Sequence, residues 1–294
     1  MCITGTKGAV MSSRKNTSSG FRSAVCEGGF TLIELLVAMT IFAIVMAGIY
    51  ETYQYQQTSY LEEEKSADMQ QTARAAAYFI GWDIRMAGYD PTGRADPGFT
   101  IANTAEMQFE MDLNQDGDMD NDTNDPDPSE IVRYALTDDG SSTARGDTSR
   151  NGTANWIDDS SNPIQNPCRL GKEYITMSGG TLSPSTPALQ PVAENVDALE
   201  FCYVLADGTE TTSPGSSQLT DIRAVYVSLL FRTSGITQRH IDDKEYVSAA
   251  GDSTITTNWD GSLTRPDPWG PFNDAYRRKL VIVKLKCRNM GLGD

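Results

Sequence analysis

The chain has 294 residues, of which 39% are hydrophobic, so it holds enough apolar material for the core of one or two domains. Its formal net charge of −16 argues against nucleic acid as a primary partner, because nucleic-acid binding requires a basic surface. The charge is uneven along the chain. Residues 1–29 contain four basic side chains and one acidic side chain, a net charge of +3, which leaves −19 for the remainder.

An apolar run of 21 residues covers positions 30–50, and Glu34 is its only charged side chain. About twenty apolar residues in a helix span the hydrocarbon core of a bilayer. A carboxylate one turn inside such a segment is costly, so we expect Glu34 to have a function. Because the basic residues precede the run and the acidic body follows it, we expect the amino terminus in the cytoplasm and the body outside.

The small residues Gly28 and Gly29 stand before this run, whereas a secretory signal carries its small-residue cleavage site after the run. A cut here would keep the apolar helix in the mature protein. The removed leader would start at Met1 or at Met11, and both starts stay open. Cys26 has no apolar run upstream, as a lipidated cysteine requires, so we exclude lipidation there.

The stretch from Gly29 to Val37, GFTLIELLV, resembles the class III signal of type IV pilins and of type II secretion pseudopilins. The resemblance implies that a prepilin peptidase removes residues 1–29 by cleaving between Gly29 and Phe30, and that Phe30 is then N-methylated. It also implies that the Glu34 carboxylate meets the amino-terminal charge of a neighbouring subunit during assembly. Such pairing lowers the desolvation cost of both charges.

Beyond the apolar run the chain turns polar but keeps apolar residues at three- and four-residue steps, which indicates one face of a helix. These residues are Met69, Ala73, Ala76, Ile80, Ile84 and Ala87. No proline occurs between Phe30 and Asp90, and Gly88 is a good helix stop. We therefore predict one helix over residues 30–88, membrane-spanning over about residues 30–50, whose second half packs under a head domain.

The remaining residues, 89–294, have the pattern of a β-rich head, which the resemblance places in the periplasm. Alternation of apolar and polar residues is clearest at Val225, Val227, Leu229 and Phe231, and it recurs around Phe109 and Tyr134. Further strand-like runs cover residues 173–177, 198–205, 222–231 and 280–286. One helix followed by many strands predicts an α+β fold with an antiparallel sheet. Residues 140–168 and 234–276 are expected to be long loops.

Two more stretches resemble PilW-type minor pilins, which are relatives of the J-type pseudopilin. They are residues 82–93, WDIRMAGYDPTG, and residues 276–289, YRRKLVIVKLKCRN. The resemblance implies a type IV pilin-like fold and a minor pilin in a tip or priming complex. Such a protein is a single-pass inner-membrane protein that later joins the pilus at the cell surface. Its implied partners are the prepilin peptidase, other minor and major pilins and the inner-membrane assembly platform.

The last of these stretches is basic within an acidic protein. Its cationic residues are Arg277, Arg278, Lys279, Lys284, Lys286 and Arg288. They predict either a patch that pairs with the acidic body of a neighbouring subunit or an edge strand that is protected by its charges.

Residues 112–120, DLNQDGDMD, form the second chemical signal of the sequence. Oxygen-bearing side chains stand at positions 1, 3 and 5 and a glycine at position 6, as in the first half of a calcium-binding loop. The expected Ca²⁺ ligands are the side chains of Asp112, Asn114 and Asp116, the backbone carbonyl of Asp118, and Asp120 through its carboxylate or a water molecule.

The second half of this stretch departs from an EF-hand. Position 12 is Thr123, where an EF-hand has a bidentate glutamate, and the flanking sequences have the pattern of strands. A closing carboxylate would come from Asp122, Asp125, Asp127 or Glu130. Two interpretations stay open: a Ca²⁺ site, or an acidic hairpin tip that binds no ion.

Three cysteines remain once the leader is removed: Cys168, Cys202 and Cys287. One disulfide and one thiol is the simplest count for an oxidising compartment, and we favour a bond between Cys168 and Cys202. Three small buried thiols are the alternative, since spacing alone fixes no pairing.

The sequence predicts a protein without enzymatic activity. Its single histidine, His240, has no cysteine or serine motif near it, and no phosphate-binding glycine loop is present. Three other functions are weighed against a minor pilin: a J-type pseudopilin of a type II secretion system, a calcium-dependent adhesin displayed on a pilus, and a membrane-anchored periplasmic hydrolase.

Overall fold

The structure is a computed structural model, and it describes residues 29–119, 130–137, 168–178, 181–184, 190–238, 240–251 and 269–291. The chain divides into two units, Met1–Gln56 and Gln57–Asp294. Of the first, the structure describes the residues from Gly29 onward. Most of the predicted loop 140–168 lies outside the described residues, and so does the middle of the loop 234–276.

Helix α1 runs from Leu32 to Met86 over 55 residues, which confirms the predicted long helix. It starts in the first unit and ends in the second. The helix stops where the sequence predicts, because Gly88 has a φ of +74° and its N–H donates to the carbonyl of Glu110 at 2.9 Å. A Cβ at Gly88 would lie 2.6 Å from the sulfur of Met290, so a side chain has no room there.

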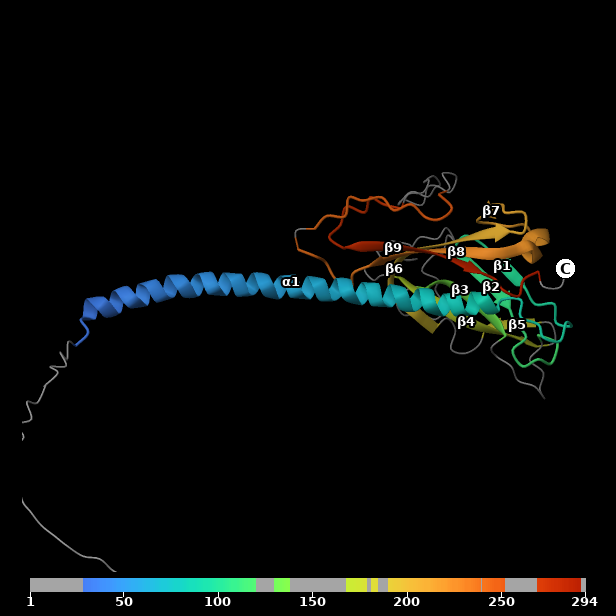
Figure 1. Ribbon diagram of the computed structural model, residues 1–294, viewed down its shortest axis with the longest axis horizontal. Helices are drawn as coiled ribbons and strands as arrows, with labels where there is room; N and C mark the ends of the chain where they lie inside the picture. The colour runs from blue at the N-terminus through green and yellow to red at the C-terminus, as the bar shows by residue number, and fades with distance from the viewer. Residues whose placement is uncertain are drawn as a thin grey trace, which may run out of the picture. The chain divides into compact units, whose positions relative to one another are not determined.

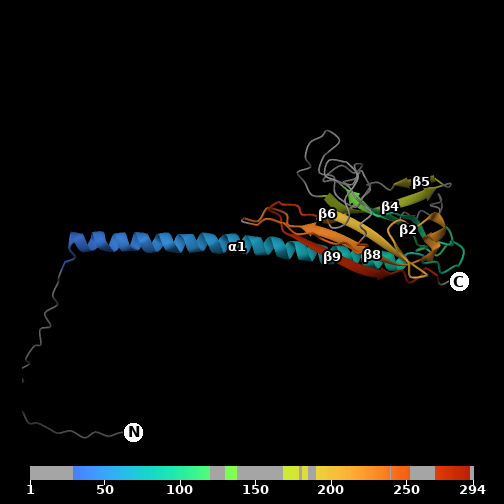
Figure 2. The same ribbon diagram turned by 90° about the horizontal axis from the view of Figure 1, so that it is seen from above.

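The described strands of the second unit form one antiparallel sheet (Figures 1 and 2). They are β1 (Phe99–Ala102), β2 (Glu106–Glu110), β3 (Ile131–Thr137), β4 (Cys168–Ser178), β5 (Thr181–Pro184), β6 (Gln190–Leu205), β7 (Glu210–Thr211), β8 (Ile222–Arg232) and β9 (Arg278–Lys286). The order is β1-β2-β3-β4-β6-β8-β9, with β5 paired to β4 and β7 paired to β6. A short 3₁₀ helix, η1 (Ser216–Asp221), leads into β8. The predicted α+β architecture is confirmed.

The core of the second unit lies between one face of α1 and the sheet. All six residues of the predicted helix stripe are buried, with Ala76, Ile80 and Ile84 completely inaccessible. They join the inward-facing strand residues in one apolar cluster, which includes Phe109, Tyr134, Val225, Val227, Leu229 and Phe231. Because a buried Met or Ile side chain contributes about 1.5–3 kcal/mol, Met69, Ile80 and Ile84 supply most of the stabilisation that the stripe gives to the helix.

Candidate functional site

The amino-terminal end of α1 carries the first group of predicted functional residues. Thr31 precedes the helix, and the Glu34 carboxylate accepts hydrogen bonds from the Thr31 N–H at 2.9 Å and from its hydroxyl at 2.8 Å. The Glu34 N–H in turn donates to the Thr31 hydroxyl oxygen at 3.3 Å. This reciprocal arrangement is a capping box, which satisfies backbone donors that the first helical turn leaves without partners. Glu34 therefore has a structural role within its own chain, besides the assembly role that the sequence predicts.

The processing residues lie directly before this capping box. Phe30 is 92% exposed, and a Cβ built on Gly29 would meet no atom within 4 Å. The Gly29–Phe30 peptide bond is thus accessible in the structure, as a substrate bond must be. The helix that follows is apolar on all sides, and its large side chains up to Tyr50 are exposed in the isolated chain.

Helix α1 is, within the described residues, the one helix long and apolar enough by length and composition to cross a membrane. Its apolar part is near the amino terminus and none of it is buried inside the protein. Such a surface requires lipid or the apolar helices of other chains around it. These features are compatible with a membrane-anchored protein.

The predicted calcium-binding residues form the connection between β2 and β3. The flanking elements are strands, which confirms that the loop is not part of an EF-hand. Asp112 is completely buried, while Asn114, Asp116 and Asp118 are exposed; Asp120 lies outside the described residues. Among the residues that the structure describes, no three His, Cys, Asp or Glu side chains form a ready-made metal cluster.

A buried ionic group that the sequence did not predict joins α1 to the sheet. The Nζ of Lys172 on β4 lies 2.7 Å from a carboxylate oxygen of Asp83, and Tyr134 on β3 donates its hydroxyl hydrogen to the same oxygen. Burial raises the pKa of Tyr134, and the negative charge of Asp83 raises it further. Burial alone would lower the pKa of Lys172, but its hydrogen bonds to Asp83 and Tyr174 outweigh burial and raise it. These shifts favour a charged ammonium on Lys172 and a neutral hydroxyl on Tyr134.

A second buried ionic group is centred on Arg278, the first residue of β9. Its guanidinium donates to Asp197 at 2.6 Å, to Asp242 at 2.9 Å and to both carboxylate oxygens of Asp274 at 2.6 and 2.7 Å. The guanidinium also lies over the ring of Phe272, 3.7 Å from its centroid. These contacts hold the described ends of the 234–276 segment against the sheet.

The position of Arg278 corrects part of the basic-patch prediction. The side chain is buried, not on the surface, whereas the other five cationic residues of the stretch are exposed on or beside the edge strand β9. Burial alone would lower the pKa of Arg278, but its three aspartate partners outweigh burial and raise it. Strand β9 is thus an edge strand with exposed charges, and Arg278 is not one of them.

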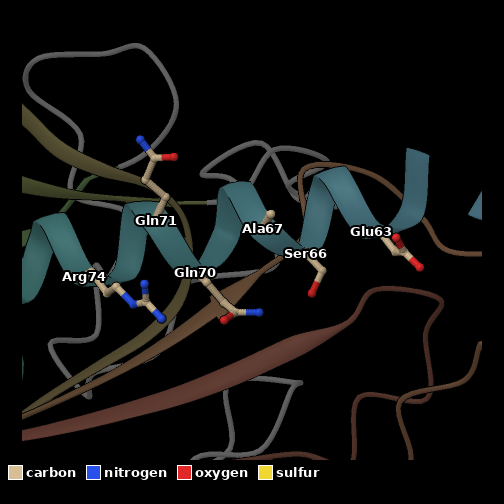
Figure 3. A pocket seen from close by; sticks show the side chains of 6 residues that line it. All are labelled: Glu63, Ser66, Ala67, Gln70, Gln71 and Arg74. Carbon is tan, nitrogen blue, oxygen red and sulfur yellow. The ribbon is translucent and has the colours of Figure 1, made fainter. Parts of the chain in front are cut away.

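A hollow of about 530 Å³ lies along α1 in the second unit (Figure 3). It is lined by Glu63, Ser66, Ala67, Gln70, Gln71 and Arg74, which share one face of the helix. Figure 3 shows the side chains of Ser66, Gln70 and Arg74 pointing to the same side of the helix. The lining residues are polar or small, and neither a histidine nor a cysteine is among them.

The strand register bears on the predicted Cys168–Cys202 disulfide. Cys168 on β4 is opposite Val196 on β6, and Cys202 lies six residues farther along β6. At about 3.3 Å per residue the two α-carbons are roughly 20 Å apart, whereas a disulfide requires less than about 7 Å. The register therefore argues against this pairing. Cys202 and Cys287 are both buried. Burial raises the pKa of the Cys287 thiol to about 12, although the positive charge of Arg223 acts to lower it.

A family model described as the prokaryotic N-terminal methylation motif matches residues 26–50. This match includes Gly29, Phe30 and Glu34, the residues that the sequence singles out. Together with the helix-on-sheet architecture, it supports a type IV pilin-like protein. Among solved structures, the chain is similar to a type IV-like pilin from Thermus thermophilus at 14% sequence identity and a TM-score of 0.38, over 75% of this chain and 97% of that chain. No curated protein matches the chain.

Proposed function

We propose that this protein is a minor pilin of the PilW type that takes part in the initiation of a type IV pilus. The observation that carries the proposal is the amino-terminal arrangement: an accessible Gly29–Phe30 bond, then a capping box with Glu34, then an apolar helix exposed on all sides. An exposed helix of this kind gains stability by packing among the apolar helices of other subunits. The matched methylation motif covers the same residues.

In the proposed pathway a prepilin peptidase cleaves between Gly29 and Phe30, and the new amino terminus is methylated. Before and after this cleavage, the apolar helix holds the chain in the inner membrane, with the head in the periplasm, until the chain joins the assembly. In the assembly, the carboxylate of Glu34 would pair with the terminal ammonium of a neighbouring Phe30. Among apolar helices a lone charge is costly, so this pair would select one axial register between subunits.

The choice of a minor pilin rather than a fibre subunit depends on the stretches 82–93 and 276–289. The helix in the second unit also presents exposed aromatic side chains, with Tyr78 at 65%, Phe79 at 55% and Trp82 at 60%. Large aromatic residues are enriched at protein interfaces, so this face suits contact with another subunit of an assembly complex. A J-type pseudopilin of a type II secretion system is the second candidate, because it has the same amino-terminal signal.

Mass spectrometry of the chain co-expressed with a prepilin peptidase tests the processing step. We expect a mature chain that begins with N-methylated Phe30, and loss of most processing in Gly29→Ala. Gly28→Ala is the matched control, and it should be processed normally. Cleavage of Gly29→Ala at the same bond and the same rate would contradict the proposal. Affinity purification of the tagged chain from membranes of a piliated strain then separates the candidates, because pilus subunits or secretion pseudopilins will accompany it.

A further inference from the structure

The β2–β3 connection contains a buried carboxylate that no protein contact accounts for fully. Asp112 is completely inaccessible to solvent, and its Oδ1 accepts a hydrogen bond from the Gln115 N–H at 2.6 Å. Its Oδ2 is buried without a hydrogen-bond partner. The hydrogen bond from Gln115 shows that this carboxylate faces the turn formed by residues 112–115. A buried carboxylate oxygen without a partner costs free energy, which a bound cation would remove.

A second buried carboxylate, at the other end of the connection, accepts hydrogen bonds from the same loop. Glu130 is 3% exposed, and its Oε1 accepts hydrogen bonds from the N–H groups of Leu113 at 2.8 Å and Asn114 at 3.3 Å. The two acidic residues, Asp112 and Glu130, are therefore brought to neighbouring positions of one turn although they are far apart in the sequence. From Asp112 to Glu130 the sequence contains eight acidic residues and no lysine or arginine.

The exposed part of the loop supplies further oxygen atoms. The Asn114 side-chain N–H donates to Asp116 at 2.6 Å, and the Asp116 N–H donates back to the Asn114 side-chain oxygen at 2.9 Å. Gly117 adopts a φ of +89°, where a Cβ would lie 2.9 Å from the hydroxyl oxygen of Thr92. The glycine thus lets the loop turn tightly against the residues that follow α1.

We propose that this loop binds one calcium ion. The ligands are the carboxylates of Asp112, Asp116 and Glu130, the side-chain oxygen of Asn114 and the backbone carbonyl of Asp118. Carboxylate, amide and backbone oxygens, without nitrogen or sulfur, are the donor set of a hard cation. Calcium fits better than magnesium, because magnesium demands a compact octahedron and keeps most of its water.

Binding requires a local rearrangement, since the described residues hold no preformed metal cluster. The buried side chains of Asp112 and Glu130 are already fixed by their backbone contacts. The exposed side chains of Asn114 and Asp116 must exchange their mutual hydrogen bonds for the ion. These side chains are at the surface, so their movement does not disturb the apolar core.

Thermal unfolding of the full chain in detergent, after removal of metal by a chelator, tests this proposal. We expect 2 mM CaCl₂ to raise the Tm by about 5 °C or more, which is the shift that a ligand gives at roughly 100 times its dissociation constant. The same concentration of MgCl₂ should give a clearly smaller shift. Calorimetric titration with CaCl₂ should show one ion bound per chain. No Tm shift with calcium, or an equal shift with magnesium, overturns the proposal.

Two variants and a control assign the effect to this loop. Asp112→Asn and Asp116→Asn should each remove most of the calcium-dependent shift. Asp116 is exposed, so its variant tests the site even if Asp112→Asn fails to fold. Asp207→Asn is the control, because Asp207 is an exposed turn aspartate whose hydrogen bonds are local, such as the one that its Oδ1 accepts from the Thr209 N–H at 2.8 Å. An undiminished shift in Asp116→Asn, or its loss in Asp207→Asn, contradicts the assignment.

Discussion

The ammonium of Lys172 on β4 lies 2.7 Å from the carboxylate of Asp83, near the carboxyl-terminal end of α1. Tyr134 donates its hydroxyl hydrogen to the same carboxylate. A shift of the helix by one turn would separate these groups and leave buried charges without partners. The apolar stripe of α1 consists largely of small and similar residues, so it alone specifies the position of the helix poorly. The ionic pair therefore supplies positional specificity that the stripe lacks.

Removing Asp83 should destabilise the protein strongly, because Lys172 would keep a charge in a largely buried site. We expect Asp83→Ala to lower the free energy of unfolding by about 3 kcal/mol. The double variant Asp83→Leu with Lys172→Met should recover most of this loss, because an apolar pair of similar volume replaces the ionic one. Urea unfolding followed by circular dichroism measures both values. A double variant as unstable as Asp83→Ala would show that the ionic pair itself, not the orphaned charge, determines stability.

Replacing Arg278 by lysine should also destabilise the protein, although the charge is kept. A lysine ammonium cannot reach Asp197, Asp242 and Asp274 with the fork geometry of a guanidinium. We expect Arg278→Lys to lower the free energy of unfolding by about 3 kcal/mol and to increase proteolysis in the 234–276 segment. Lys279→Ala is the matched control on the same strand; its side chain is exposed, so the change should be within about 0.5 kcal/mol. Equal unfolding midpoints for the two variants would rule out a structural role for the Arg278 group.

The stability of the head should fall in alkaline solution partly because of Cys287. Its pKa is about 12 in the folded chain against an ordinary value of 9.0, so the folded state keeps the thiol proton over a range where the unfolded state loses it. The contribution is fully present below pH 9 and declines until about pH 12. Between pH 9 and pH 12, the free energy of unfolding of Cys287→Ala should fall less steeply with pH than that of the wild type, by up to about 1.4 kcal/mol per pH unit. Urea titrations at four pH values from 8 to 11 give both slopes, and parallel slopes would contradict the shift.

The helix and the central strands could be predicted from the sequence, because their apolar residues follow the period of the element. Ile80 and Ile84 mark the helix face, while Val225 and Phe231 mark the inward face of β8, and all four are buried. The start of β6 was missed because half of the residues of Gln190–Asp197 are polar and one is a proline, which weakens a strand pattern. One of its polar residues is explained by a tertiary contact instead: Asp197 is buried against Arg278, 81 positions away.

The candidate sites also differ in whether the local sequence predicts them. The processing residues and the capping box could be read locally, since Thr31-x-x-Glu34 before an apolar run is a helix-start signature. By contrast, no local pattern distinguishes Arg278 from the exposed Lys279 beside it. A buried charge is determined by partners that the fold brings together, and those partners lie on distant segments of the chain.

Glu34 has two roles that one substitution can separate. Glu34→Gln keeps an oxygen that accepts hydrogen bonds from Thr31, so the capping box and the start of α1 should survive, but the charge is lost. Glu34→Ala loses both. If the charge pairs with the amino terminus of a neighbouring subunit, both variants should be cleaved normally yet co-purify with other pilins about tenfold less than the wild type, a difference of about 1.4 kcal/mol. Quantitative immunoblotting of the membrane complex measures this ratio. Normal recovery of Glu34→Gln with poor recovery of Glu34→Ala would show instead that helix capping, and not the charge, is what assembly requires.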